Sequence, residues 1–156
     1  SKTAALFSAA CKVGAILGKK DEKAKEALSS YGKNLGVTFQ IADDTLDYNS
    51  DLKKFGKTVG KDFYEGKITL PIIILNQQCK NGERDMLKEF FSKKERSKND
   101  LNYTLDAIKK YDVIKQCYKK ADHFISLASS SLNVFESSEQ KNILKNLTSF
   151  SIERSF

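Results

Sequence analysis

The sequence predicts an all-α protein. The 156-residue chain contains a single proline and no tryptophan, and its apolar residues, 40% of the total, recur at helical spacing. Alternating apolar and polar runs bounded by turn residues, which would predict strands, are hard to find. A chain of this length can bury a core of its own, so we expect a single helical domain over residues 1–156.

Two long helices are expected in the first third of the chain. Residues 2–17 are rich in alanine and open on a Lys-Thr pair. The small residues that would let a neighbouring helix approach this segment closely are Ala5, Ala9, Ala10 and Gly14. The second helix is expected to begin near Asp21, whose side chain is suited to cap a helix N-terminus, and to run past Asp47.

The remainder is expected to be one loop followed by shorter helices. Residues 50–67 contain three glycines and five lysines without a sustained period, which predicts a loop. Pro71 then falls in the first turn of an apolar helix, where its missing N–H group costs least. Further helices are expected over residues 83–92, 99–110, 112–132 and 137–153.

Charge and cysteine content narrow the class of protein. The net charge is +7, but the lysines are spread along the chain without a block of five or six basic residues, so nucleic-acid binding is not favoured. The three cysteines stand far apart without metal-site spacing, which indicates reduced core thiols in a cytoplasmic protein. No signal peptide is visible, and no apolar run approaches the about 18 residues of a membrane span.

The stretch FQIADDTLDY, residues 39–48, places acidic side chains on one side of the second helix. An α-helix turns about 100° per residue, so Asp43, Asp44 and Asp47 form one narrow stripe, which Gln40 joins. Apolar residues border this stripe on both sides, whereas a solvated acidic face is broad and mixed in charge. Carboxylates held this close favour a hard divalent cation, Mg²⁺ before others, whose coordination is completed by phosphate oxygens.

The glycine- and lysine-rich segment that follows is compatible with a phosphate ligand. Its lysines at positions 57, 61 and 67 could act as point charges on a diphosphate, or could be solvated. Its glycines at positions 56, 60 and 66 would allow tight turns and a close approach of backbone N–H groups to an anion. The glycine spacing in GKTVGKD excludes a P-loop.

Three stretches together resemble the trans-isoprenyl diphosphate synthases, and within that family the long-chain, octaprenyl-type polyprenyl synthases that make quinone side chains. They are KTAALF, YGKNLGVTFQIADDTLDY and FGKTVGKDFYEGKITLPII, in this order and spacing. The resemblance runs through the whole chain and implies the C-terminal half of the isoprenoid-synthase helical bundle. Family members are longer, and their first aspartate-rich motif lies in a preceding half that this chain lacks.

The resemblance implies a role for each residue of the three stretches that matches a family motif. The implied metal ligands, which bind Mg²⁺ directly or through water, are Asp43, Asp44 and Asp47. The implied contacts to the allylic diphosphate are Lys2, Lys57 and, as a weaker candidate, Lys67. Thr3 and Gln40 would place oxygen dipoles near the allylic carbocation, and Phe39 would line the wall along the prenyl chain.

The implied activity is that of a prenyltransferase. In the full-length enzyme, isopentenyl diphosphate and an allylic diphosphate would condense head to tail in a Mg²⁺-dependent reaction, and the product would partition to membrane. We expect the fragment alone to be inactive and to self-associate, as a homo-oligomer, through the apolar face that truncation exposes. The alternative is a non-catalytic helical subunit or interaction module derived from a prenyl synthase.

Overall fold

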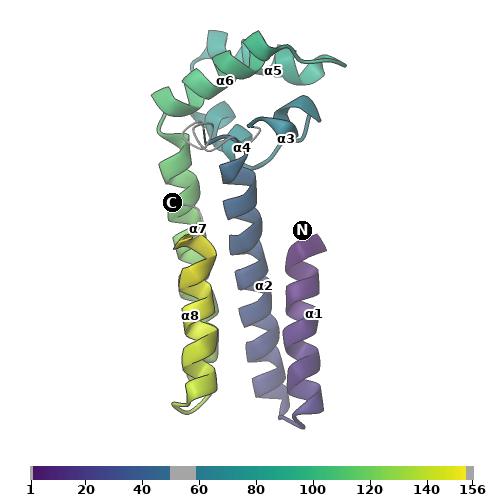
Figure 1. Cartoon of the computed structure of the whole chain (residues 1–156), viewed down its shortest axis with the longest axis vertical. Coiled ribbons are helices and arrows are strands. Elements are labelled where there is room, and N and C mark those ends of the chain that lie inside the picture. The colour runs from purple at the N-terminus through teal and green to yellow at the C-terminus, as the bar shows by residue number, and fades with distance from the viewer. Residues whose placement is uncertain (1, 50–58, 154–156) are drawn as a thin grey trace. The chain divides into compact units, whose positions relative to one another are not determined.

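The computed structural model describes residues 2–49 and 59–153, and over these residues it contains helices and no strand. The all-α prediction is therefore confirmed. The helices, in chain order (Figure 1), are α1 (Lys2–Leu17), α2 (Glu22–Leu46), α3 (Lys61–Tyr64), α4 (Leu70–Gln78), α5 (Asn81–Ser92), α6 (Lys98–Lys110), α7 (Val113–Ser131) and α8 (Glu139–Glu153). A 3₁₀ turn, η2 (Leu132–Val134), precedes α8.

The chain divides into two compact units. The first comprises Ser1–Ala42 and Tyr118–Phe156, and the second comprises Asp43–Cys117. Helix α2 therefore contributes its last four residues to the second unit, and α7 contributes its first five. The expectation of a single helical domain over residues 1–156 stays a prediction.

The core of the first unit lies between α2 on one side and α7 with the following 3₁₀ turn η2 on the other. Its buried residues are Tyr31, Leu35, Ala128 and Leu132. The hydroxyl group of Tyr31 donates a hydrogen bond to the backbone carbonyl oxygen of Leu144 in α8 at 2.8 Å, so one side chain ties α2 to the last helix. Burial, with a smaller contribution from Cys11, raises the pKa of Tyr31 to about 12.

Helix α1 packs along α2 through two glycines of α2 (Figure 1). A Cβ atom at Gly32 would lie 2.4 Å from the carbonyl oxygen of Phe7, and one at Gly36 would lie 2.7 Å from the Cα atom of Ala4. The small residues of α1 from which a close helix approach was predicted do not make this contact, because they are exposed; these are Ala5, Ala9, Ala10 and Gly14. The close approach depends on missing side chains in α2.

The second unit is built around aromatic residues. Phe63 of α3 is fully buried and meets Phe91 of α5 edge to face, with the ring centroids 5.4 Å apart. Arg96 donates hydrogen bonds to the carbonyl oxygens of Phe91 at 2.9 Å and Tyr64 at 3.3 Å, so it joins the C-terminal ends of α3 and α5. Part of the predicted loop is thus helical, and residues 50–58 lie outside the described residues.

Local sequence signals predict two helix starts correctly. The Asp21 carboxylate accepts a hydrogen bond from the backbone N–H group of Ala24 at 2.8 Å, which confirms it as the N-terminal cap of α2. Pro71 lies in the first turn of α4, as predicted. Within the described part of the chain, no helix combines the length and the apolar character that crossing a bilayer requires.

Candidate functional site

Two of the predicted site residues in the first unit contact each other. The hydroxyl group of Thr3 in α1 donates a hydrogen bond to the side-chain oxygen Oε1 of Gln40 in α2, at 2.9 Å. Both side chains are half-buried, and Lys2, one residue earlier, is exposed. Thr3 and Gln40 are 37 positions apart in the sequence, and the structure brings them into contact. They are the two residues expected from the resemblance to place oxygen dipoles near the allylic carbocation.

Phe39 of α2 remains accessible beside this pair. Its side chain is 40% exposed, which is high for a phenylalanine in the middle of a helix. One side of its ring stacks on Phe7 of α1, with the ring centroids 6.0 Å apart and the planes inclined by 30°. An exposed aromatic surface of this kind can contact an apolar ligand.

The three aspartates of the motif lie in different environments at the end of α2. Asp43 is exposed and Asp44 is half-buried, both in the last turn of the helix, and Asp47 follows directly after it. Among the residues that the structure describes, no group of three or more acidic, histidine or cysteine side chains is arranged to hold a metal ion. A cage made of protein ligands alone is therefore not formed by these residues.

The carboxylate of Asp47 binds the backbone of the chain that follows. Its Oδ1 atom accepts a hydrogen bond from the N–H group of Lys61 at 3.0 Å, and its Oδ2 atom accepts one from the N–H group of Asp62 at 2.8 Å. Partial burial raises the pKa of Asp47, and these two backbone hydrogen bonds oppose that rise. Asp47 thus caps the first turn of α3 from outside that helix.

The carboxylates at the end of α2 suit a metal ion that is bound partly by the protein and partly by the phosphate groups of a substrate. Mg²⁺ is commonly held by one or two carboxylates, keeps several waters and takes further oxygens from substrate phosphates. Asp43 and Asp44 supply two carboxylates of this kind in adjacent positions. Each oxygen of Asp47 already accepts one hydrogen bond and retains a second lone pair, which can accept a hydrogen bond from a metal-bound water.

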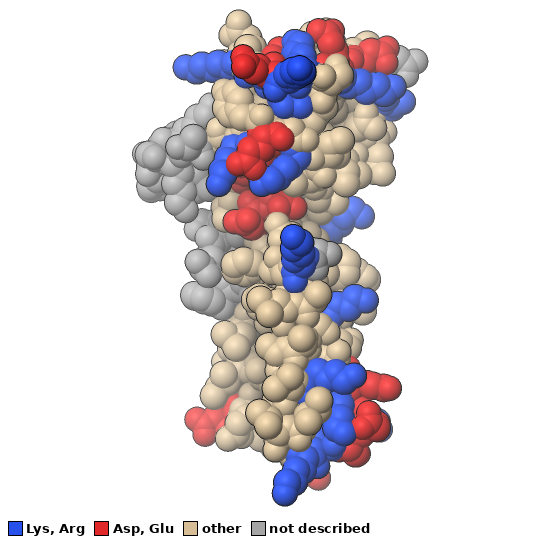
Figure 2. All heavy atoms as spheres, turned by 90° about the vertical axis from the view of Figure 1, so that its right-hand side faces the viewer, with Lys and Arg blue, Asp and Glu red and all other residues tan. Residues whose placement is uncertain are grey.

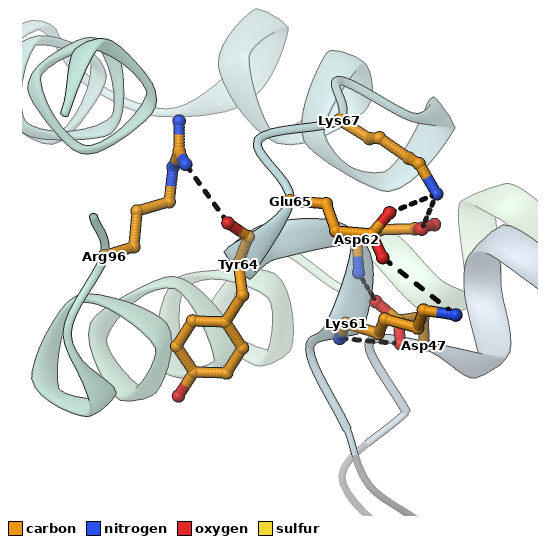
Figure 3. Close-up of polar contacts among 7 residues, drawn as sticks. All are labelled: Asp47, Lys61, Asp62, Tyr64, Glu65, Lys67 and Arg96. Carbon is orange, nitrogen blue, oxygen red and sulfur yellow. Dashed lines mark hydrogen bonds and ion pairs between the residues drawn. The ribbon is translucent and has the colours of Figure 1, made fainter. Parts of the chain in front are cut away.

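The lysines of the following segment have different surroundings (Figure 3). The ammonium nitrogen Nζ of Lys67 lies 3.1 Å from Oδ1 of Asp62 and 2.6 Å from Oε2 of Glu65, and these two contacts raise the pKa of Lys67. Lys61 is exposed, and its nitrogen is 4.0 Å from Glu65. Lys57 lies outside the described residues.

The glycines of this segment serve the protein's own packing. The N–H group of Gly60 donates to the carbonyl oxygen of Asp47 at 2.8 Å, and that of Gly66 donates to the carbonyl oxygen of Phe63 at 3.0 Å. Both glycines have positive φ, 89° and 71°. The predicted tight turns are therefore confirmed at Gly60 and Gly66, but the N–H groups of these two glycines are engaged within the chain and do not face an anion; Gly56 lies outside the described residues.

The sequence interpretation missed three residues around the aspartate motif. Asp62 and Glu65 were not singled out, although their spacing from Lys67 within one short segment is a signal for ion pairing. The side chain of Tyr48 is 1% exposed, so its hydroxyl group is buried. Burial raises the pKa of Tyr48, and the negative charges of Asp47 and Asp62 raise it further.

Sequence comparison relates this chain to prenyl diphosphate synthases. The family described as Polyprenyl synthetase matches residues 1–108. The chain is 37% identical over 155 residues to the geranylgeranyl diphosphate synthase of Sulfolobus acidocaldarius, covering 98% of this chain and 47% of the relative. It is 33% identical over 153 residues to the all-trans-nonaprenyl-diphosphate synthase (geranyl-diphosphate specific) of Rhodobacter capsulatus, covering 98% of this chain and 46% of the relative. The chain spans about half the length of these curated relatives.

Structural comparison gives the same result. The fold is similar to the crystal structure of a polyprenyl synthase from Caulobacter crescentus complexed with calcium and isoprenyl diphosphate, with a TM-score of 0.89 and 32% sequence identity. This match covers 99% of the chain and 47% of the solved chain, so the likeness extends over both compact units. The chain therefore belongs to the polyprenyl synthetase family.

Proposed function

We propose that this chain carries one half of the active site of a polyprenyl diphosphate synthase, a prenyltransferase that condenses isopentenyl diphosphate head to tail with an allylic diphosphate. One observation supports the proposal above others. The chain belongs to this family, and at the end of α2 the side chain of Asp43 is exposed and that of Asp44 is half-buried, with Asp47 directly after the helix. This donor set suits a metal that is shared with a diphosphate.

The proposed cofactor is Mg²⁺. Its charge would stabilise the negative charge that develops on a departing diphosphate. Asp43 and Asp44 would hold it through carboxylate oxygens, and Asp47 would act directly or through a metal-bound water. The solved relative from Caulobacter crescentus, complexed with calcium and isoprenyl diphosphate, supports a divalent cation together with a diphosphate ligand.

Lysines would balance the remaining charge of the allylic diphosphate. Lys2 is exposed on the first turn of α1 and would contact this diphosphate as a point charge, as would Lys57. Lys67 is a weaker candidate, because its ammonium group already contacts two carboxylates. Diphosphate leaves readily only when its growing charge is met in this way, so the contribution of these residues is electrostatic.

Thr3, Gln40 and Phe39 would act on the prenyl group itself. The hydrogen bond from Thr3 fixes the amide of Gln40, so that the oxygen dipoles of both side chains are held in place before a substrate binds. These dipoles would stabilise the allylic carbocation. The exposed part of the Phe39 ring would contact the hydrocarbon chain. The proton released after condensation would pass to the diphosphate, so no further side-chain base is needed.

The apolar surface of α1 supports the predicted self-association. Its exposed side chains, with exposed fractions of 70%, 51%, 50% and 77%, are Leu6, Val13, Ile16 and Leu17. Figure 2 shows uncharged surface between the charged groups of the face that it presents. Apolar surface of this kind is typically covered by a partner, here another copy of the chain or the rest of a synthase. Light scattering on the purified chain should therefore give a mass above 17.6 kDa.

A calorimetric titration with farnesyl diphosphate, with and without Mg²⁺, tests the proposed site. We expect binding that requires Mg²⁺ and that is lost in the double variant Asp43→Asn with Asp44→Asn. Asp106→Asn is the matched control, because Asp106 is an exposed aspartate of α6 that has no proposed ligand. Binding that survives the double variant, or that needs no metal, would contradict the assignment.

The same titration separates the alternatives. A non-catalytic subunit or interaction module would bind no diphosphate under any of these conditions. A nucleic-acid-binding protein would bind DNA in a salt-dependent manner without a metal requirement. Figure 2 does not favour that alternative, because lysines and arginines are mixed with aspartates and glutamates on the face that it presents. Turnover would be sought after adding the other half of a family synthase.

A further inference from the structure

Asp47 holds three consecutive backbone N–H groups. Its side chain accepts from the N–H groups of Lys61 and Asp62, and its carbonyl oxygen accepts from the N–H group of Gly60 at 2.8 Å. These groups lie at the start of α3, where N–H groups have no partner within a helix. Since α3 has only four residues, it cannot be stable by itself, and its first turn depends on Asp47.

Asp62 and Lys67 extend this contact along the same segment (Figure 3). The Asp62 side chain, 16% exposed, accepts from the Lys67 ammonium group at 3.1 Å, and the Asp62 carbonyl oxygen accepts from the Lys67 N–H group at 2.9 Å. Glu65 contacts the same ammonium group at 2.6 Å. Hydrogen bonds and an ion pair therefore link Asp47, the residue after α2, to Asp62 in α3 and Asp62 to Lys67, three residues after α3 ends.

Lys67 would have to lose these contacts to bind a diphosphate directly. Its ammonium group faces two carboxylates, whose combined charge exceeds its own. Charge-assisted hydrogen bonds of this kind are among the stronger polar contacts in proteins. Asp43, by contrast, is exposed in the turn just before Asp47, and its carboxylate can reach a ligand without breaking such a network.

We propose that Asp47, Asp62 and Lys67 form a clamp that holds α3 against the end of α2, and that Lys67 acts through this clamp instead of contacting the diphosphate. The proposal rests on the function proposed above and narrows it. Asp43 and Asp44 are then the direct ligands, and Asp47 and Lys67 are positioning residues. The clamp keeps α3 and the end of α2 in one arrangement before any ligand binds, which lowers the cost of ordering them on binding.

Amide hydrogen exchange of the ligand-free chain tests the clamp. Asp47→Asn and Lys67→Met should each speed exchange at the N–H groups of Lys61 and Asp62 by about tenfold or more, as expected for the loss of a charge-assisted contact. Asp43→Asn should leave these two rates unchanged. Unchanged rates at both amides in Asp47→Asn or in Lys67→Met would overturn the proposal. Circular dichroism checks that each variant folds.

Calorimetry with inorganic diphosphate and Mg²⁺ then tests the role of Lys67. If Lys67 acts through the clamp, Lys67→Met and Asp62→Asn should weaken binding by similar factors, and the double variant should be no worse than either. If Lys67 is instead a direct ligand, Asp62→Asn frees its charge and should tighten binding, which would contradict the clamp. Lys93→Met is the matched control, because Lys93 is similarly paired with Asp100 at 3.2 Å.

The two experiments separate failure of the clamp from failure of the proposed function. A wild-type chain that binds no diphosphate in Mg²⁺ would remove the proposed function from this chain, and the exchange rates would still decide whether the clamp exists. Diphosphate binding with unaltered exchange in Asp47→Asn would keep the function and remove the clamp.

Discussion

The hydroxyl group of Thr3 donates a 2.9 Å hydrogen bond to the side-chain oxygen of Gln40, and this contact joins the start of α1 to the long helix α2. Thr3→Val keeps the shape of the side chain and removes the donor, so we expect the free energy of unfolding to fall by about 1 kcal/mol. Urea denaturation measures this change.

Thr3→Ser is the matched control for this prediction, because it keeps the hydroxyl group and should keep more of the stability than Thr3→Val does. The reverse order of the two variants would show that the methyl group of Thr3, and not its hydrogen bond to Gln40, stabilises the contact between the helices.

The close packing of α1 on α2 predicts that alanine is not tolerated at Gly32. A Cβ atom there would lie 2.4 Å from the carbonyl oxygen of Phe7 and 2.8 Å from the sulfur atom of Cys11. The two helices would have to separate, so Gly32→Ala should lower the free energy of unfolding by about 1–3 kcal/mol, as overpacking typically does. The measurement is the midpoint of thermal or urea denaturation.

Gly14→Ala is the opposite case within the same pair of helices. No atom outside the local backbone lies within 4 Å of a Cβ built at Gly14, and the residue is inside α1. Alanine is favoured over glycine in a helix by about 1 kcal/mol, so Gly14→Ala should stabilise the chain. If Gly14→Ala and Gly32→Ala changed stability alike, the described contact between α1 and α2 would be incorrect.

These two glycines also show where prediction from the sequence ends. The longer helices, the cap at Asp21 and the position of Pro71 follow from local chemistry, and the structure has them as predicted. Local chemistry does not predict which face of α1 contacts α2, because small residues occur on several sides of α1. The choice depends on glycines in α2, about 20 or more positions away, and on how their gaps match the α1 backbone.

The candidate site follows the same division. The pairing of Asp43 with Asp44 could be predicted from helical spacing, because both lie in the last turn of α2. The prediction that this helix runs past Asp47 is wrong, because α2 ends at Leu46. Helix α3 could not be predicted from local spacing, because its first N–H groups, those of Lys61 and Asp62, are bound by Asp47. These two residues lie 14 and 15 positions after Asp47 in the sequence. The pairing of Lys67 with Asp62 likewise depends on that turn, so a lysine expected to bind an anion is held by carboxylates.

The contacts of Glu83 predict a pH dependence of stability. Its carboxylate accepts from the Lys110 ammonium group at 2.6 Å and also from the Tyr111 hydroxyl group, and these contacts lower its pKa from 4.5 to about 2. Because the pKa is lower in the folded than in the unfolded chain, the contacts stabilise the fold above pH 4.5, and this contribution falls as the pH drops toward about 2.

Denaturation of wild type and Glu83→Gln across this pH range measures the effect. The wild type should be the more stable at neutral pH, and the gap should shrink as the pH falls from 4.5 to about 2, since protonated glutamate and glutamine are then both neutral. Because the group is accessible to solvent, added salt should reduce the gap. A gap that stays constant with pH would show that Glu83 contributes through packing alone.

Gly66 and Arg96 predict a coupled effect at the end of α3. Gly66 has φ of 71°, and a Cβ atom there would lie 2.7 Å from the Nη2 atom of Arg96, whose guanidinium group is fixed by the carbonyl oxygens of Tyr64 and Phe91. Gly66→Ala should therefore lower the free energy of unfolding by about 1–2 kcal/mol, because alanine is strained in the left-handed backbone conformation. It should lower this free energy further because Arg96 must give up its two hydrogen bonds.

A double-mutant cycle with Arg96→Ala separates these two costs. In the Arg96→Ala background the clash is absent, so Gly66→Ala should cost only the backbone share, and the two changes should be less than additive. Unfolding free energies of the four proteins measure the coupling. Strict additivity would mean that the arginine moves aside without loss, and the backbone conformation of Gly66 alone would then explain why glycine is needed there.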